Sequence, residues 1–150
     1  MSSQDIISPP KAMLAKGDSL ADAVKALRDN GFSPLPVVDA KDRFAGVFGP
    51  RELLAVLLPR AARLGEDDMP DLSFISDSYD DIKARLGAAA KESVGKVMAP
   101  HRTVHRDTPL VEMLLLLHRG DAFLPVVDES GKLVGVVTAA AVLSLIVEGV

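Results

Sequence analysis

The chain has 150 residues, of which 48% are hydrophobic, and a net charge of −4. This length allows one compact domain or two small halves that share a core, and the apolar content excludes a disordered chain. The acidic balance lacks the basic surface that a nucleic-acid-binding protein needs, so we expect no nucleic acid as a partner. The chain has no cysteine, which excludes disulfides, thiolate metal sites and cysteine nucleophiles.

The sequence carries no pattern of a secreted or membrane-spanning protein. Residues 1–10 lack the charged and apolar regions of a secretory signal. The longest apolar stretches, 53–58 and 142–147, are far shorter than the roughly 20 residues that span a bilayer. We therefore expect a cytoplasmic protein without membrane insertion.

The first set of predicted elements is a helix, a β-hairpin and a second helix. Ser19 can cap a helix that Gly31 ends, and the apolar face of this helix consists of Leu20, Ala23, Val24 and Leu27. Two apolar runs, 35–38 and 44–48, flank a polar turn and predict the hairpin. A helix over 50–58 follows, with Pro50 at its first position.

The stretch between this set and the next is predicted to be a structured linker. An acidic run at 65–71 precedes a short apolar anchor at 72–75. The acidic run lacks the ligand spacing of a calcium loop, so we expect a solvated loop. Ser78 and Asp81 form a capping box for a helix that runs to about residue 91. The inward stripe of this helix is predicted to be Tyr79, Ile82 and Leu86.

The second set repeats the plan. Thr108 is the predicted cap, Pro109 lies in the first turn and Gly120 ends the helix. A turn at 129–132 and a final helix at 139–147 follow. The first of these helices has five consecutive apolar residues, 113–117, so it must be covered on more than one side. Either a second copy of the chain or the interior of the monomer would cover it, and the sequence leaves both alternatives open.

The two sets are an internal repeat. Residues 17–58 align without a gap with residues 106–147, and eleven of the 42 pairs are identical. The segment Leu35–Asp39 recurs as Leu124–Asp128, and Gly46–Val47 recurs as Gly135–Val136.

Each copy resembles the CBS (cystathionine-beta-synthase-type) domain. The entry segments 6–9 and 97–100, the amphipathic helix, the Leu-Pro-Val-Val-Asp strand and the Gly-Val pair before the last helix carry the resemblance. It implies an α/β fold of two β-α-β-β-α units, related by pseudo-twofold symmetry and joined by a helical linker. We place the first unit at 1–60, the linker at 61–94 and the second unit at 95–150. The resemblance also implies a homodimer.

The resemblance further implies that clefts between the units bind adenosine-containing ligands. The ligand signature of the family is a glycine, two apolar residues, a Thr or Ser, two further residues and an Asp. The first copy has Gly49 at the hydroxyl position and Glu52 at the acid position. The second copy has Thr138 at the hydroxyl position but Ala141 at the acid position. Each copy therefore keeps one half of the signature.

The candidate ligand-binding residues, by this analogy, are Thr138, Glu52, Thr103, Val104, Leu124, Pro125 and Arg51. A helix cap explains Thr138 equally well, a first-turn acid explains Glu52, and core packing explains the apolar candidates. His101 and His105 lie in an extended segment, so a zinc site is not expected. No catalytic constellation is visible, and the chain is predicted not to be an enzyme.

Two functions remain open. The first is a regulatory module that binds AMP, ADP, ATP or S-adenosylmethionine between its units and signals to an unidentified effector protein. The alternative is a ligand-free CBS scaffold for dimerisation or interaction, which the substitutions at Gly49 and Ala141 favour. Beyond an adenine nucleotide, no cofactor is expected.

Overall fold

The computed structural model describes residues 6–59, 77–148 and 150. The predicted acidic run and apolar anchor at 65–75 lie outside these residues. The first unit contains β1 (Leu14–Ala15), α1 (Leu20–Asp29), β2 (Leu35–Val38), β3 (Phe44–Phe48) and α2 (Pro50–Leu57). The linker contributes α4 (Tyr79–Ala89) and a 3-10 helix, η2 (Val94–Lys96). The second unit contains α5 (Leu110–His118), β4 (Phe123–Val127), β5 (Leu133–Thr138) and α6 (Ala139–Val147).

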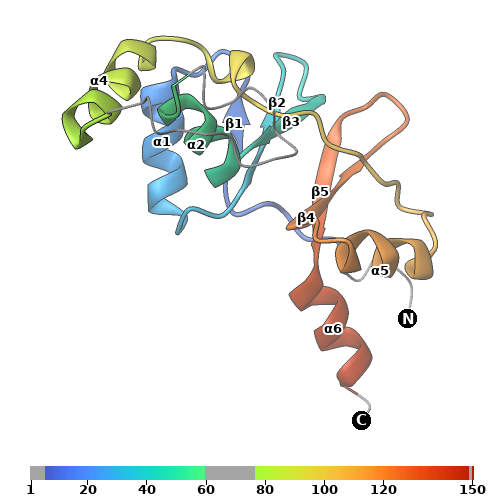
Figure 1. Cartoon of the computed structure of the whole chain (residues 1–150). Coiled ribbons are helices and arrows are strands. Elements are labelled where there is room, and N and C mark those ends of the chain that lie inside the picture. Colours follow the sequence, from blue (N-terminus) through green and yellow to red (C-terminus); the bar gives the residue numbers. More distant parts are fainter. Residues whose placement is uncertain (1–5, 60–76, 149) are drawn as a thin grey trace.

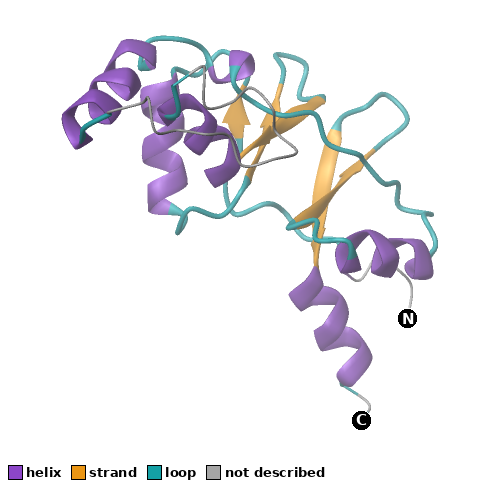
Figure 2. Ribbon diagram, viewed as in Figure 1, coloured by secondary structure: helices purple, strands orange, loops and turns teal. Residues whose placement is uncertain are grey.

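The strands of both units lie together at the centre of the molecule, and the helices lie outside them (Figures 1 and 2). In the first unit β2 pairs antiparallel with β3 and parallel with β1. In the second unit β4 pairs antiparallel with β5, and a parallel bridge from Val104 to Val126 takes the place of β1. The two predicted β-α-β-β-α units are confirmed.

Helix boundaries follow local capping chemistry. The Ser19 hydroxyl accepts a hydrogen bond from the Asp22 N–H (3.1 Å), and Gly31, with φ +67°, lies just beyond the end of α1 as predicted. The capping box of Ser78 and Asp81 is also confirmed.

Two local predictions are wrong. Thr108 does not cap α5, because Pro109 directly precedes the helix and the Thr108 hydroxyl accepts from the His105 N–H (2.9 Å) in the preceding turn. Tyr79 does not face inward, since 74% of its surface is exposed and the Lys83 ammonium lies 5.8 Å from the centre of its ring. The first turn of α4 therefore lies outside the packed face, which begins further along at Leu86.

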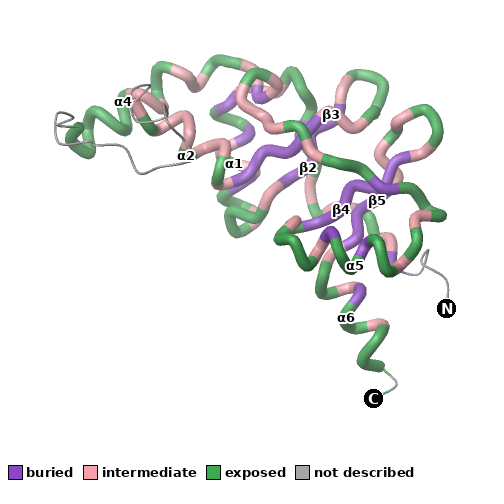
Figure 3. Tube along the Cα trace, turned by 45° about the vertical axis from the view of Figure 1, so that its right-hand side comes forward, coloured by how far each residue is buried: buried purple, intermediate pink, exposed green. Residues whose placement is uncertain are grey.

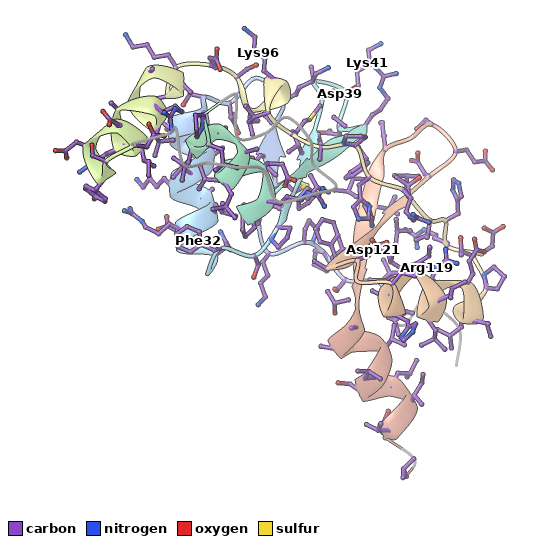
Figure 4. The ribbon with its side chains drawn as sticks, viewed as in Figure 1. Phe32, Asp39, Lys41, Lys96, Arg119 and Asp121 are labelled. Atoms are coloured by element: carbon purple, nitrogen blue, oxygen red, sulfur yellow. The ribbon has the colours of Figure 1, made fainter. Side chains whose placement is uncertain are left out.

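The two hairpin turns are organised by equivalent aspartates of the repeat. The Asp39 carboxylate accepts from the backbone N–H groups of Lys41 (2.8 Å) and Arg43 (3.0 Å) and from the Arg43 guanidinium (2.9 Å). Desolvation raises the pKa of Asp39, but these donors outweigh it and hold the pKa below 3.8. Figure 4 shows Asp39 and Lys41 in the hairpin that joins β2 and β3.

Asp128 has the same role in the second unit. It accepts from the Ser130 hydroxyl (2.8 Å) and from the backbone N–H groups of Ser130 and Lys132 (both 2.9 Å). The Ser130 hydroxyl contributes most to lowering the pKa of Asp128 below 3.8. The Leu-Pro-Val-Val-Asp repeat thus encodes a strand together with the acceptor that shapes the following turn.

The entry segment of each unit packs on the other unit. In Figure 1 the blue entry segment leaves the second unit and runs back to β1. Ser8 pairs with Val136 of β5 through two backbone hydrogen bonds (3.0 and 2.8 Å), and Ile6 is buried in the second unit's core. In return, Ala99 pairs with Val47 of β3 through two bonds of 2.9 Å, and Met98 packs on the first unit's core.

Gly46 and Gly135, the paired glycines of the repeat, permit these crossings. A Cβ on Gly46 would lie 2.7 Å from the Ala99 carbonyl oxygen. A Cβ on Gly135 would lie 2.6 Å from the Ile7 side chain and 2.9 Å from the Ser8 carbonyl oxygen. Because part of each obstacle is backbone, it cannot move aside without breaking the pairing. The glycines are therefore needed for close approach between chain segments.

Figure 3 shows that burial concentrates on the strands, whereas α6 and much of α4 are exposed. On α5, Met113 and Leu116 are buried, but Leu115 and Val111 are exposed, the latter by 76%. The reading in which the monomer buries all of α5 is therefore wrong. The outer face of this helix has no cover within the described residues.

Because the crossing segments leave no room for a side chain at the two glycines, adding a single methyl group at either one should destabilise the fold. Gly46→Ala and Gly135→Ala should each lower the free energy of unfolding by about 1–3 kcal/mol, the usual cost of overpacking. Gly87→Ala is the matched control, because a Cβ at that position in α4 meets nothing within 4 Å. Gly87→Ala should raise the free energy of unfolding by about 0.5–1 kcal/mol. Urea denaturation measures all three, and unchanged stability of Gly135→Ala would contradict the crossing.

The two turn aspartates predict loss of stability in acid. Because their folded pKa values are lowered, they stabilise the fold above the unfolded pKa of about 3.9 and lose this contribution as the pH falls through the folded values. A protein with Asp39→Asn and Asp128→Asn should lose less stability than the wild type between about pH 5 and pH 2. Chemical denaturation at each pH tests this, and parallel loss in the two proteins would disprove it.

Candidate functional site

An apolar seam joins the two units. Val47 of β3, Val136 of β5 and Phe123 of β4 form one buried cluster, with Phe44 packed against it. The hairpins also bond to each other, since the Phe44 N–H donates to the Gly131 carbonyl (2.9 Å). Two clefts lie along this seam, and Pro34, Ala122 and Phe123 line both.

The larger cleft, here called the Thr138 cleft, has a volume of about 390 Å³. The first unit supplies most of its wall, and the second unit supplies the end of β5. Its lining residues are Ser8, Pro9, Pro10, Lys11, Ala12, Asn30, Ser33, Pro34, Leu35, Pro36, Ala122, Phe123, Val136 and Thr138. One wall is therefore the crossed entry segment itself.

Thr138 occupies the junction between β5 and α6. Its hydroxyl oxygen accepts from the Ala141 N–H (3.1 Å), which caps α6 as the sequence suggested. The hydroxyl proton is free to serve a second acceptor, because accepting a hydrogen bond uses only a lone pair. Thr138 can therefore cap the helix and donate to an anion in the cleft at the same time.

The smaller cleft, here called the Glu52 cleft, has a volume of about 230 Å³ and uses the equivalent positions of the opposite units. Its lining residues are Pro34, Val47, Gly49, Pro50, Arg51, Glu52, His101, Gly120, Asp121, Ala122 and Phe123. Gly49 stands where the other cleft has Thr138, so no hydroxyl is available at the start of α2. Glu52 reaches back and accepts from the Gly49 N–H (2.8 Å), and its carboxylate is therefore used in capping.

Asp121 gives the Glu52 cleft a second carboxylate. It lies two residues before β4, near the junction of the units (Figure 4). One of its oxygens, Oδ2, is buried without a hydrogen-bond partner, and the Arg102 Nε lies 3.8 Å from it. The His101 Nε2 lies 3.7 Å from Oδ1, and the His101 ring stacks on Phe123 at a centroid distance of 6.0 Å. The His101 Nδ1 lies 2.7 Å from the Arg102 carbonyl oxygen, to which it donates.

The structure divides the seven predicted site residues. Thr138 lines one cleft, whereas Glu52 and Arg51 line the other. Thr103 is exposed and lines neither cleft. Val104, Leu124 and Pro125 are buried, and they line neither cleft either. Their contact with adenine stays a prediction that this placement does not support.

Residues that the sequence reasoning missed come from the opposite copy. Leu35 and Pro36, the repeat equivalents of Leu124 and Pro125, line the Thr138 cleft together with Lys11. Applying the offset of the internal repeat to the predicted pair would have found them. What the sequence does not reveal is the crossing, which places the strand of one copy beside the last helix of the other.

Among the described residues, no three His, Asp or Glu side chains gather in a way that could hold a metal ion. Within the same part of the chain, no helix is both long and apolar enough to cross a membrane.

Comparison with known proteins identifies the repeat. The model of the CBS domain matches residues 4–59 and 94–148. The chain is 30% identical over 130 residues to the chloroplastic CBS domain-containing protein CBSX2 of Arabidopsis thaliana, a match that covers 83% of this chain and 54% of the relative. The chain thus spans about half the length of that relative.

Two solved structures resemble the fold. CBSX2 in complex with AMP superposes with a TM-score of 0.68 at 24% identity, covering 98% of this chain and 96% of the other. CbpB in complex with c-di-AMP gives a TM-score of 0.71 at 15% identity, covering 97% and 84% of the two chains. At these identities the likeness bears on the fold alone.

Proposed function

The chain belongs to the CBS-domain family, and on this premise we propose that it is a regulatory module that binds an adenosine-type nucleotide in the Thr138 cleft. The observation that carries the proposal is the composition of that cleft. Thr138 and the start of α6 offer donors, and Lys11 offers a positive charge, at one cavity between the units. AMP in CBSX2 and c-di-AMP in CbpB support the ligand class, which also includes ADP, ATP and S-adenosylmethionine.

The remaining walls of the cleft suit a base. Leu35, Pro36, Val136 and Phe123 present apolar surface, and the seam behind them is already packed. The flat face of an adenine can cover such surface, because these four side chains have no polar groups that would be left unpaired. The volume of about 390 Å³ falls at the lower end of the range typical of small-ligand pockets.

The Glu52 cleft suits a phosphate less well. Glu52 and Asp121 oppose a second anion there, and the cleft has no hydroxyl equivalent to Thr138. Arg51, the one arginine among the described lining residues, offsets only part of this. We therefore place one nucleotide in each chain.

A route for signalling follows from the crossing. The entry segment forms one wall of the Thr138 cleft, and Ser8 in that segment is bonded to β5. A ligand that presses on this wall changes the pairing between the units, and an effector protein on another chain reads the change. The chain is then a regulator and not an enzyme. The expected cytoplasmic location stays a prediction, since CBSX2 is described as chloroplastic.

Nucleotide binding predicts a specific effect of Thr138. Calorimetry should detect AMP binding. Thr138→Ala should lower the affinity for AMP several-fold and leave the affinity for adenosine unchanged, because the lost hydroxyl faces the phosphate. Ser19→Ala is the matched control, since it removes an equivalent helix cap (3.1 Å) outside the cleft. Each variant should lose about 1 kcal/mol of stability.

The outcomes separate the two functions of the chain. No heat and no shift of the melting temperature with AMP, ADP, ATP or S-adenosylmethionine would reject nucleotide binding and favour the ligand-free scaffold. Equal weakening by Ser19→Ala and Thr138→Ala would show that stability, and not contact with the phosphate, controls binding.

A second function, homodimerisation, is favoured by the uncovered faces of α5 and α6. The exposed apolar side chains there are Val111, Leu114, Leu115, Leu143, Ile146 and Val147. Leu114, Leu117, Ala139, Val142 and Leu143, together with His118, line a groove of about 390 Å³ between the two helices. Such a continuous apolar face marks an interaction surface.

We infer that a second copy of the chain covers this face. Helix α6 contains no charged residue, so a twofold contact would bring no like charges of α6 together. The equivalent helix of the first unit, α2, is instead packed against α4 within the chain, where the Arg85 guanidinium donates to the Leu57 carbonyl (2.6 Å). The second unit has no such covering helix among the described residues.

Dimerisation through α6 predicts different effects for two equivalent leucines. Leu143 and Leu54 occupy the same repeat position and are 55% and 58% exposed. Leu143→Arg should raise the dimer dissociation constant at least about tenfold, because a buried charge opposes the contact. Leu54→Arg should leave it unchanged. Light scattering after size exclusion measures both, and a monomeric wild type or an unaffected Leu143→Arg would reject the interface.

A further inference from the structure

The polar side chains that line the Thr138 cleft are neutral or positively charged. Among the described residues that line it, Lys11 is the only charged side chain, and none is an Asp or Glu. The neutral side chains that could accept a hydrogen bond are Ser8, Asn30, Ser33 and Thr138. The described lining can therefore attract an anion, but it includes no anionic acceptor.

The absence of a carboxylate bears on the sugar of a bound nucleotide. A carboxylate is the side chain that can accept from both hydroxyls of a ribose at once, and charge-assisted bonds of this kind are about twice as strong as neutral ones. In the first turn of α6, Ala141 places a methyl group against the second unit's core, and its N–H is bonded to Thr138. No acid therefore reaches the sugar from this turn.

The other copy does not supply the missing acid. Glu52, the repeat equivalent of Ala141, lines the opposite cleft and accepts from the Gly49 N–H (2.8 Å). Asp121 also lines only the opposite cleft. Glu52 and Asp121 thus line a different cleft from Lys11 and Thr138.

We propose that the Thr138 cleft selects its ligand by base and phosphate and does not distinguish ribose from 2′-deoxyribose. Its ligands are then adenine mononucleotides of both sugar types. The proposal rests on nucleotide binding in this cleft, as argued above. A site built to bond a hydroxyl discriminates strongly against an analogue that lacks it, because the partner group is left unpaired. Here no charged group would be left unpaired by removal of the 2′-hydroxyl.

The direct test is calorimetry of the wild-type chain with AMP, 2′-deoxy-AMP and adenosine. The dissociation constants of AMP and 2′-deoxy-AMP should differ by less than about fivefold, since only neutral acceptors are available. Adenosine should bind more weakly than either, because it lacks the phosphate. A preference of about fivefold or more for AMP over 2′-deoxy-AMP overturns the proposal while nucleotide binding stands. Failure of both nucleotides to bind overturns nucleotide binding and the proposal together.

Variants of Lys11 provide a second measurement that does not disturb packing, since this side chain is exposed. Lys11→Met should lower the affinities for AMP and 2′-deoxy-AMP by the same factor and leave the affinity for adenosine unchanged. Lys25→Met, which removes another exposed charge, on α1 and outside the cleft, should change the affinity for none of the three ligands. Weakening of AMP without weakening of 2′-deoxy-AMP would show that Lys11 reads the sugar and would contradict the proposal.

Discussion

The close backbone contact between each entry segment and the opposite unit is the constraint on which the rest of the structure depends. Four backbone hydrogen bonds, two at Ser8 with Val136 and two at Ala99 with Val47, tie the units together. They form only because Gly46 and Gly135 leave room for the crossing chain. The same crossing buries Ile6 in the second unit's core and forms one wall of the Thr138 cleft. The contacts that join the two units therefore also shape this cleft.

The symmetry of this framework does not extend to its chemistry. The repeat places the start of a helix at each cleft, yet one begins with Thr138 and the other with Gly49. The carboxylate of Glu52 is committed to its own helix, whereas Ala141 offers only a methyl group. One scaffold thus carries an anion-attracting cleft with Lys11 and a second cleft in which carboxylates predominate. The two clefts of this scaffold therefore present different chemistry to a ligand.

The outer helices show how local pattern and tertiary context differ in what they determine. α1 was predictable, because Ser19 and Gly31 mark its two ends and its four apolar residues lie on one face. That face packs against a single core. The apolar run of α5 was ambiguous. A helix with apolar residues on all sides must be covered on more than one side, but its sequence does not show which part of the protein, or which partner, covers it. In the structure Met113 faces the core and Leu115 faces outward. Tyr79 was misplaced for a related reason, since helical spacing indicates a face but not where along the helix packing begins.

The sequence by itself determined the two units, their strands and hairpin turns, and most helix ends. These depend on contacts between near neighbours, such as Asp128 with Lys132, and the repeat presents each pattern twice. It also identified Thr138 and Glu52 as the residues at the starts of the last helices. Only the tertiary structure decided that Thr138 lies beside Leu35 and Pro36 of the other copy, and that Leu124 and Pro125 are buried. The crossing joins residues far apart in the chain, and neither spacing nor composition records which copy each entry segment will join.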